Sequence, residues 1–398
     1  MLARYIADVI GAFRTIKSLR VGLCAGWLAV VMMHTLTVQA QLLPGALLSG
    51  DATGFDTVEA VSPLQFPRDH GPHLGYRSEW WYVTGHLLAP DGREFGLQLT
   101  FFRFRLRPPP VALAGAARIA PAASSWRTDH VWMAHFAITD VATGQFHSFE
   151  RFSRGGRLGL AGATAVPFEV WLEDWSIRST ADNAEWPWRL RANDGVISMD
   201  LVIDRGRRPT PQGDNGFSRK GNGIGNASYY YSMTRLSGQG SLRIGNKAIA
   251  GPVTLWIDRE WSSSALAANQ VGWDWFGLHL DDGRDLMLYR MRRRDGSTDP
   301  FSAATLIEAD GSTRKFSSDA FVVTPSAYTS LASGRQYPLL WRLQIPKAHV
   351  DLEVRGTQVE QEHDGLIPYW EGLVRAFTSD GTLVGRGYLE MTGYTPAR

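Results

Sequence analysis

The sequence WWYVTGHL at residues 80–87 is followed by DGRE at 91–94, and a related pair occurs 193 residues later. The second copy reads WDWFGLHL at 273–280 and DGRD at 282–285. In both copies a Trp-rich segment ending in His-Leu leads through an Asp-Gly pair into another apolar segment, which is the pattern of a tight β-hairpin. Because the offset is the size of a domain, we predict two related β domains rather than a solenoid.

Further Asp-Gly pairs divide the chain into short segments of alternating apolar residues. The pairs occur seven times, at 91–92, 194–195, 282–283, 295–296, 310–311, 364–365 and 380–381. Residues 95–101 alternate in one phase, and Phe102 and Phe104 continue in the opposite phase, which predicts a β-bulge near Phe101. The Ala-rich segment 111–123 contains Gly and Pro and is expected to be a loop.

We therefore predict an all-β fold of two tandem antiparallel domains, at residues 61–240 and 241–398. The boundary is placed in the Gly-rich stretch that follows residue 235. Antiparallel sheets of this size must close or stack to protect their edges, so each domain is either a barrel or a sandwich. A closed barrel of about eight strands could hold one small ligand inside.

The first forty residues resemble an export signal, and residues 41–60 resemble a linker. Arg4, Arg14, Lys17 and Arg20 precede an apolar run at 21–33, which is short for a membrane span, and an A-x-A-like cleavage site ends at Ala40. The alternative is an uncleaved membrane anchor. With cleavage near Ala40, we expect a periplasmic or secreted protein without stable membrane insertion.

The composition and charge of the chain exclude several classes of function. The 398 residues are 44% hydrophobic and 20% charged, with a formal net charge of +2. Asp8 and the four basic residues give the leader +3, so the rest of the chain carries −1, and no basic face for a nucleic acid is expected. The single cysteine, Cys24, lies in the leader and excludes disulfide frameworks and Cys-based zinc sites.

Long Trp-rich motifs resemble those of the AttH-like and carotenoid 1,2-hydratase (hydroxyneurosporene synthase) family. They are FPRDHGPH at 66–73 with YRSEWWYVTG at 76–85, SYYYS at 228–232, WIDREW at 256–261 with GWDWF at 272–276, and GRGYLEMTGY at 385–394. The resemblance covers residues 60–395 and implies two lipocalin-like barrels in contact. Relatives of the secreted branch are predicted hydrolases or export-operon partners, and distant fungal relatives act as pericyclases. An export or ABC-transporter system is therefore an expected partner.

The hydratase branch adds water to a terminal isoprenoid double bond. Its site pattern is Asp-His-x-Trp followed by Tyr-x-Asp on a later strand. Here the first part is Asp258-Arg259-Glu260-Trp261 and the second is Tyr289-Arg290-Met291. Asp258, Trp261 and Tyr289 match, whereas Arg259 and Met291 depart from the pattern, and neither Arg nor Met can transfer a proton near neutral pH.

The candidate catalytic residues are Glu79, Asp258, Glu260 and Tyr289. A carboxyl group in an aromatic wall loses hydration, so its pKa rises and it can donate a proton. On a strand Asp258 and Glu260 share a face while Arg259 points to the other. The alternative is that these charges form structural ion pairs at a barrel end or between the domains.

The candidate ligand-binding residues are aromatic side chains and two histidines: Trp81, Tyr82, Trp261, Trp273, Trp275, His73 and His135. Trp273 and Trp275 share a face, but Trp80 and Trp81 point opposite ways, so we expect at least one of that pair to pack in a core or between the domains. His70, His86 and His279 add to the histidines, but the spacing does not give the convergent ligands of a zinc site. We expect neither a metal nor a cofactor.

Two functions follow from these residues. The first is an exported protein that binds a large apolar molecule, isoprenoid or lipid-like, inside a barrel or between the barrels. The second is a hydratase-like lyase that uses Glu79, Asp258 or Glu260 as its acid. A secreted hydrolase is a third possibility, although the chain has no G-x-S-x-G elbow and the run Ser262–Ser264 is typical of a turn.

Overall fold

The computed structural model describes residues 52–109, 128–156, 158–181, 185–264 and 266–395. This part of the chain is nearly all β, with three 3-10 turns, η1 (Arg68–His70), η2 (Ser318–Ala320) and η3 (Pro346–Ala348). Within it, no helix has the length and apolarity needed to cross a bilayer. The expected leader, with Cys24, and the expected loop at 111–123 lie outside the described residues.

The first sheet has 13 antiparallel strands, arranged β4-β3-β2-β1-β13-β12-β9-β8-β7-β6-β5, with β10 and β11 paired to β12. In chain order they are β1 (Ser78–Leu88), β2 (Glu94–Arg105), β3 (His130–Asp140), β4 (Gln145–Arg154), β5 (Ala161–Ala165), β6 (Phe168–Leu172), β7 (Trp175–Ser179), β8 (Trp188–Asp194), β9 (Ile197–Ile203), β10 (Thr210–Pro211), β11 (Phe217–Arg219), β12 (Ala227–Ile244) and β13 (Lys247–Ser262).

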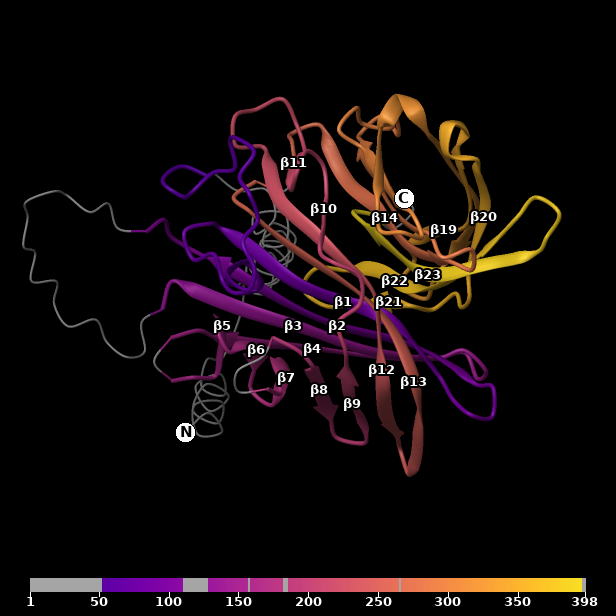
Figure 1. Ribbon diagram of the computed structural model, residues 1–398, viewed down its shortest axis with the longest axis horizontal. Helices are drawn as coiled ribbons and strands as arrows, with labels where there is room; N and C mark the ends of the chain where they lie inside the picture. Colours follow the sequence, from indigo (N-terminus) through magenta and orange to yellow (C-terminus); the bar gives the residue numbers. More distant parts are fainter. Residues whose placement is uncertain (1–51, 110–127, 157, 182–184, 265, 396–398) are drawn as a thin grey trace, which may run out of the picture. The chain divides into compact units, whose positions relative to one another are not determined.

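The second sheet has 10 strands, arranged β17-β16-β15-β14-β23-β22-β20-β19-β18, with β21 paired to β22. They are β14 (Gln270–Leu280), β15 (Asp285–Arg293), β16 (Ala303–Ile307), β17 (Thr313–Ser317), β18 (Val322–Ser330), β19 (Gln336–Ile345), β20 (Val350–Gly356), β21 (Glu362–His363), β22 (Tyr369–Phe377) and β23 (Leu383–Thr392). Figure 1 shows the first sheet in indigo to salmon and the second in orange to yellow.

The repeated sequences form equivalent hairpins in the two sheets. The first copy forms β1–β2 and the second forms β14–β15. In each sheet the first strand of the hairpin also pairs with the last long strand, β13 in one and β23 in the other. Six of the seven Asp-Gly glycines, all except Gly365, have φ between 61° and 89°, a region that only glycine adopts without strain. The prediction of two related β domains from this repeat is confirmed.

Two details differ from the sequence predictions. The predicted domain boundary at residue 240 lies inside β12. Strands β12 and β13 form one long hairpin of the first sheet, so the chain passes to the second sheet between Ser262 and Gln270. The predicted bulge near Phe101 is wrong, because β1 and β2 pair without interruption from Ser78↔Phe104 to Leu88↔Glu94. The apolar residues change phase along β2 because both faces of this strand are buried.

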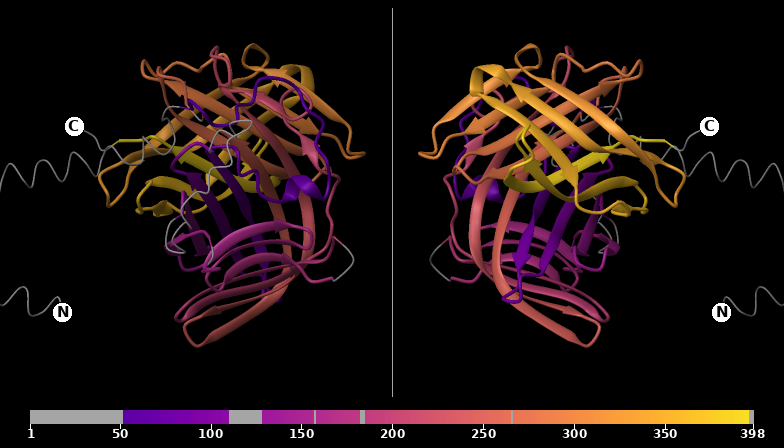
Figure 2. Two further views of the ribbon diagram at one scale, coloured as in Figure 1. Left: turned by 90° about the vertical axis from the view of Figure 1, so that its left-hand side faces the viewer. Right: turned by 90° about the vertical axis from the view of Figure 1, so that its right-hand side faces the viewer.

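Each sheet curls around its own apolar core, as Figure 2 shows. Trp81, Phe101 and Trp188 belong to the core of the first sheet, and Phe276 and Trp341 to that of the second. A third buried cluster lies where the outer faces of the two sheets meet, and it includes Tyr82, Tyr230, Trp256, Trp275, Met287, Tyr289 and Tyr388. The architecture matches tandem lipocalin-like domains in contact through this third cluster.

Candidate functional site

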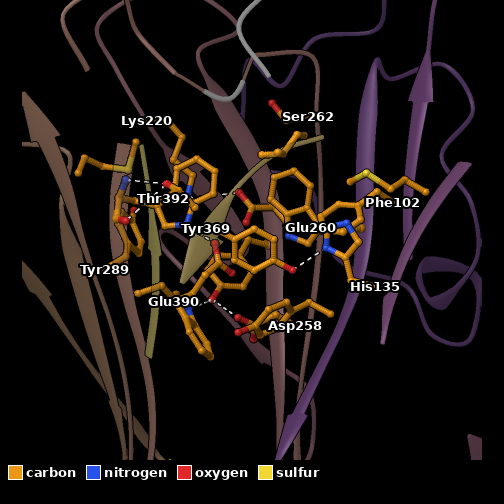
Figure 3. Close-up of a pocket in the computed structure, with 18 of the residues that line it drawn as sticks. Phe102, His135, Lys220, Asp258, Glu260, Ser262, Tyr289, Tyr369, Glu390 and Thr392 are labelled. Carbon is orange, nitrogen blue, oxygen red and sulfur yellow. Dashed lines mark hydrogen bonds and ion pairs between the residues drawn. The ribbon is translucent and has the colours of Figure 1, made fainter. Parts of the chain in front are cut away.

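A partly enclosed cavity lies between the two sheets and is shown in Figure 3. Its volume is about 100 Å³. The first sheet contributes Trp80, Tyr82, Phe102, Phe104, Met133, His135, Tyr230, Asp258, Glu260 and Ser262 to its wall. The second sheet contributes Trp273, Trp275, Tyr289, Met291, Tyr369, Glu390 and Thr392.

The space inside the first sheet is much smaller. Beside Trp81 and Trp188 it amounts to about 10 Å³, the size of a single water molecule. The inner faces of both sheets are filled with close-packed apolar side chains. The candidate ligand site is therefore the cavity between the sheets.

Strand alternation explains which side chains reach this cavity. On β13, Asp258 and Glu260 face the cavity, while Arg259 points into the first sheet. On β14, Trp273 and Trp275 face the cavity together. Trp80 lines the cavity and Trp81 packs in the core, as their opposite directions predict.

Asp258 is the carboxyl group best prepared to donate a proton. It is buried, and burial raises its pKa to about 7, against hydrogen bonds from Ser232, Tyr230 and Trp256 that favour the ionised form. Ser232 Oγ and Trp256 Nε1 donate to Oδ1 at 2.5 and 2.7 Å, and Tyr230 Oη donates to Oδ2 at 2.5 Å. Among the described residues Tyr230 is the only hydrogen-bond partner of Oδ2, so this oxygen has a free lone pair that can carry the acidic proton.

Glu390 on β23 is a second carboxyl group in the cavity wall, and the sequence predictions missed it. Trp273 Nε1 donates to Glu390 Oε1 at 2.8 Å. Burial, helped by the charges of Asp258 and Glu260 and opposed by the hydrogen bond from Trp273, raises the pKa of Glu390 to about 7. Glu390 lies within the motif at 385–394 and alternates with Tyr388 and Thr392, a pattern that places all three on one strand face.

Glu260, the third carboxyl group in the wall, is paired with a buried lysine. Lys220 Nζ lies 3.3 Å from Glu260 Oε1 and 4.2 Å from the ring centroid of Tyr289. Burial alone would lower the pKa of Lys220, but the charge of Glu260 raises it, so the ion pair persists. Tyr289 Oη lies 3.1 Å from Ser218 Oγ. This end of the cavity is therefore polar and carries a buried ion pair.

Glu79 does not line the cavity, and its predicted role as an acid is wrong. It is completely buried inside the first sheet, where Arg103 Nε donates to Oε1 and Arg259 Nη2 donates to Oε2 at 2.5 Å. Although burial alone would raise its pKa, the charges of Arg103 and Arg259 hold the pKa of Glu79 well below its usual value. A carboxylate held ionised in this way is a structural counter-charge.

Three predicted ligand-binding residues also face the core of the first sheet. Trp81 packs under the guanidinium of Arg259, at 3.8 Å from the ring centroid. His73 stacks on Trp261 with centroids 3.7 Å apart, and its backbone N–H donates to Glu79. The family pattern suggested Trp261, but alternation on β13 turns it away from Asp258.

The arrangement is suited to protonating an unsaturated apolar molecule. A carboxyl group such as Asp258, with its pKa raised to about 7, can donate a proton near neutral pH, and the rings of Trp80, Trp273 and Trp275 can stabilise a carbocation through their π faces. Among the described residues, no group of three His, Cys, Asp or Glu side chains could hold a metal ion.

The chain matches the AttH-like family over residues 57–394, which is most of its length. The chain belongs to the AttH-like family. No match is found among the curated proteins. A solved structure of an AttH candidate from Nitrosomonas europaea is 34% identical to this AttH-like chain, with a TM-score of 0.73, and the match covers 86% of this chain and 100% of that one.

Two more distant structures share the fold. Kievitone hydratase from Nectria haematococca is 16% identical, with a TM-score of 0.61, and the match covers 86% of this chain and 97% of that one. CghA with Sch210972 is 12% identical, with a TM-score of 0.51, covering 88% and 99% of the two chains. These likenesses show the lipocalin-like fold of this AttH-like protein.

The two departures from the hydratase pattern lie in different environments. Arg259 faces the core of the first sheet, so it does not alter the cavity. Met291 faces the cavity where the pattern has an aspartate. Glu390 approaches the same region from β23, which pairs with β14 on the side opposite to β15. The cavity of this AttH-like protein therefore keeps a second carboxyl group, on a different strand.

Proposed function

We propose that this protein is a hydro-lyase that adds water to a double bond at the end of an apolar, isoprenoid-like molecule. The observation that carries the proposal is Asp258, a buried acid with a pKa of about 7 in an aromatic cavity. The kinship with a hydratase fold supports it. Because the cavity is only partly enclosed and has a volume of about 100 Å³, it holds the reacting end of a long chain rather than the whole molecule.

The reaction balances as follows. Asp258 transfers its proton to one carbon of the double bond, forming a C–H bond and leaving a carbocation on the neighbouring carbon. The rings of Trp80 and Trp273 stabilise that charge. The oxygen of a water molecule bonds to the cationic carbon, and one water proton passes to a base in the cavity wall. The sum is one water added.

Hydration can be tested with acyclic isoprenoids in detergent micelles. Purified protein is incubated with lycopene or squalene in ¹⁸O-labelled water, and the products are analysed by mass spectrometry. We expect a tertiary alcohol that contains one labelled oxygen. A protein that binds these compounds, as measured by quenching of tryptophan fluorescence, without forming the alcohol would contradict the lyase proposal.

The pH dependence follows from the direction of the Asp258 shift. Because Asp258 must be protonated to act as the acid and its pKa is about 7, kcat/KM should fall about tenfold per pH unit above that value. The measurement is the initial rate of hydration of lycopene across the neutral range. A rate that keeps rising through pH 8 would contradict Asp258 as the proton donor.

Binding without chemistry is the second candidate function. Met291 favours it, because a thioether replaces the carboxylate of the hydratase pattern in the cavity wall. An exported carrier of an apolar molecule would need the aromatic walls but not the acids. The labelled-water experiment separates the two functions, since a carrier gives quenching and no labelled product.

A further inference from the structure

A chain of three side chains leads from the cavity to the protein surface. Tyr369 on β22 and His135 on β3 both line the cavity, and Tyr369 Oη lies 2.6 Å from His135 Nδ1. The other ring nitrogen, Nε2, lies 3.0 Å from Oε2 of Glu150 on β4. His135 is fully buried, whereas the side chain of Glu150 is 23% exposed. The chain thus joins the two sheets and ends near solvent.

One hydrogen bond to the phenol has a fixed direction. Gln98 Nε2, which can only donate, lies 2.8 Å from Tyr369 Oη, so the phenol accepts there. The proton of the phenol can then point to His135 Nδ1 or to the carboxyl group of Glu371, which is also a hydrogen-bond partner of Tyr369. When it points to His135, the imidazole carries its own proton on Nε2, which faces the carboxylate of Glu150, and one lone pair of Tyr369 Oη remains for a molecule in the cavity.

Neighbouring groups hold this geometry in place. The ring of His363 stacks on that of His135 with centroids 5.2 Å apart, and Ser148 Oγ lies 2.7 Å from His363 Nδ1. The backbone N–H of Leu366 donates to Glu150 Oε2 at 3.1 Å. Burial and the charge of Glu371 raise the pKa of Tyr369 well above its usual value, which keeps the phenol protonated.

We propose that Glu150, His135 and Tyr369 form a proton relay that activates water for attack on the carbocation; this inference rests on the proposed function. A water molecule in the cavity donates a hydrogen bond to Tyr369 Oη. As its oxygen bonds to carbon, its proton moves to Tyr369 while the phenolic proton moves to His135 Nδ1. Glu150 stabilises the resulting imidazolium, accepts its Nε2 proton and, being near solvent, passes that proton to water. Asp258 takes up a proton from solvent, and the imidazole returns to its Nε2–H tautomer before the next turnover, so the sum is one water added to the double bond.

The variants Tyr369→Phe and His135→Gln test the relay with lycopene as the substrate. Each should lower kcat by about 100-fold or more with KM nearly unchanged. Tyr337→Phe is the matched control, because Tyr337 is a buried phenol that donates to Glu362 at 2.7 Å within the second core, away from the cavity. The control should hydrate lycopene at the wild-type rate.

A readout without substrate separates failure of the relay from failure of the proposed function. In ¹⁵N-histidine NMR spectra, His135 should be protonated on Nε2 and accept at Nδ1, and Tyr369→Phe should remove the Nδ1 hydrogen bond. The opposite tautomer, or wild-type kcat in Tyr369→Phe, would overturn the relay in an enzyme that hydrates. Wild-type protein with the expected tautomer but no hydration would overturn the proposed function and the catalytic role of the relay together.

Discussion

Replacing Asp258 by asparagine is expected to lower the rate of hydration about 100- to 10,000-fold while leaving the fold and ligand binding intact. The carboxyl group lies in the cavity wall with its pKa raised to about 7, so it is the proton donor there. Asparagine has nearly the same shape as the protonated acid and can still accept hydrogen bonds from Ser232 and Trp256. The first measurement is kcat for the hydration of lycopene in ¹⁸O-labelled water. The second is the binding of retinol, followed by fluorescence, which checks that the variant still binds an apolar ligand.

The matched control for this substitution is Asp200→Asn. Asp200 is a partly exposed aspartate that pairs with Arg189 and Arg191 on the first sheet, far from the cavity lining. It should keep wild-type turnover. If Asp258→Asn also turned over at the wild-type rate, Asp258 would not be the acid, and the same loss in both variants would point to a general defect in folding.

Replacing Glu79 by glutamine is expected to destabilise the protein by about 3–5 kcal/mol, because it leaves two buried cations without a counter-charge. Arg103 and Arg259 are both completely or almost completely buried against Glu79. Their remaining hydrogen bonds go to backbone carbonyls, such as those of His73 and Gly71, and to histidine ring nitrogens, and none of these groups is a carboxylate that could replace Glu79. Denaturation by urea, followed by tryptophan fluorescence, measures the free energy of unfolding.

Asp351→Asn is the control for this prediction. Asp351 pairs with Arg342 at 2.8 Å, and the two side chains are 46% and 54% exposed. Exposed ion pairs contribute at most about 1 kcal/mol, so this variant should unfold close to the wild type. A Glu79→Gln protein as stable as Asp351→Asn would contradict the structural role assigned to Glu79.

The hairpin repeat and the Asp-Gly turns were sufficient to predict the fold class, because strand alternation and positive-φ turns are local properties of the sequence. The position of the domain boundary, in contrast, depends on pairing between strands and is not a local property of the sequence. The Gly-rich stretch after residue 235 has the composition of a linker, but Gly238 and Gly240 lie within β12. These positions are glycine because the backbone or side chains of neighbouring strands leave no room for a Cβ atom. A Cβ at Gly238 would lie 2.0 Å from the carbonyl oxygen of Val202.

The site could be predicted in part for the same reason. Alternation correctly placed Asp258 with Glu260 and Trp273 with Trp275, since each pair is two residues apart on one strand. It could not show which face of a strand meets the second sheet. Glu79 therefore remained a candidate acid until its position beside two buried arginines was known.

Glu390 and Tyr369 show the other limit of sequence reasoning. Glu390 reaches the cavity because β23 pairs with β14, a strand distant in the chain, and Tyr369 lies on β22, the hairpin partner of β23. The repeat at 80–87 and 273–280 identified the two strands that face each other. Neither Glu390 on β23 nor Tyr369 on β22 was predicted from the sequence.

The central claim is that the substrate reacts between the two sheets, beside Asp258. A crystal structure of the Asp258→Asn variant with bound lycopene or squalene tests it most directly, because the variant is expected to bind without turnover. The account predicts the terminal double bond in the cavity, within contact distance of residue 258 and flanked by Trp80 and Trp273. A ligand seated inside either barrel, with the cavity between the sheets empty, would contradict it.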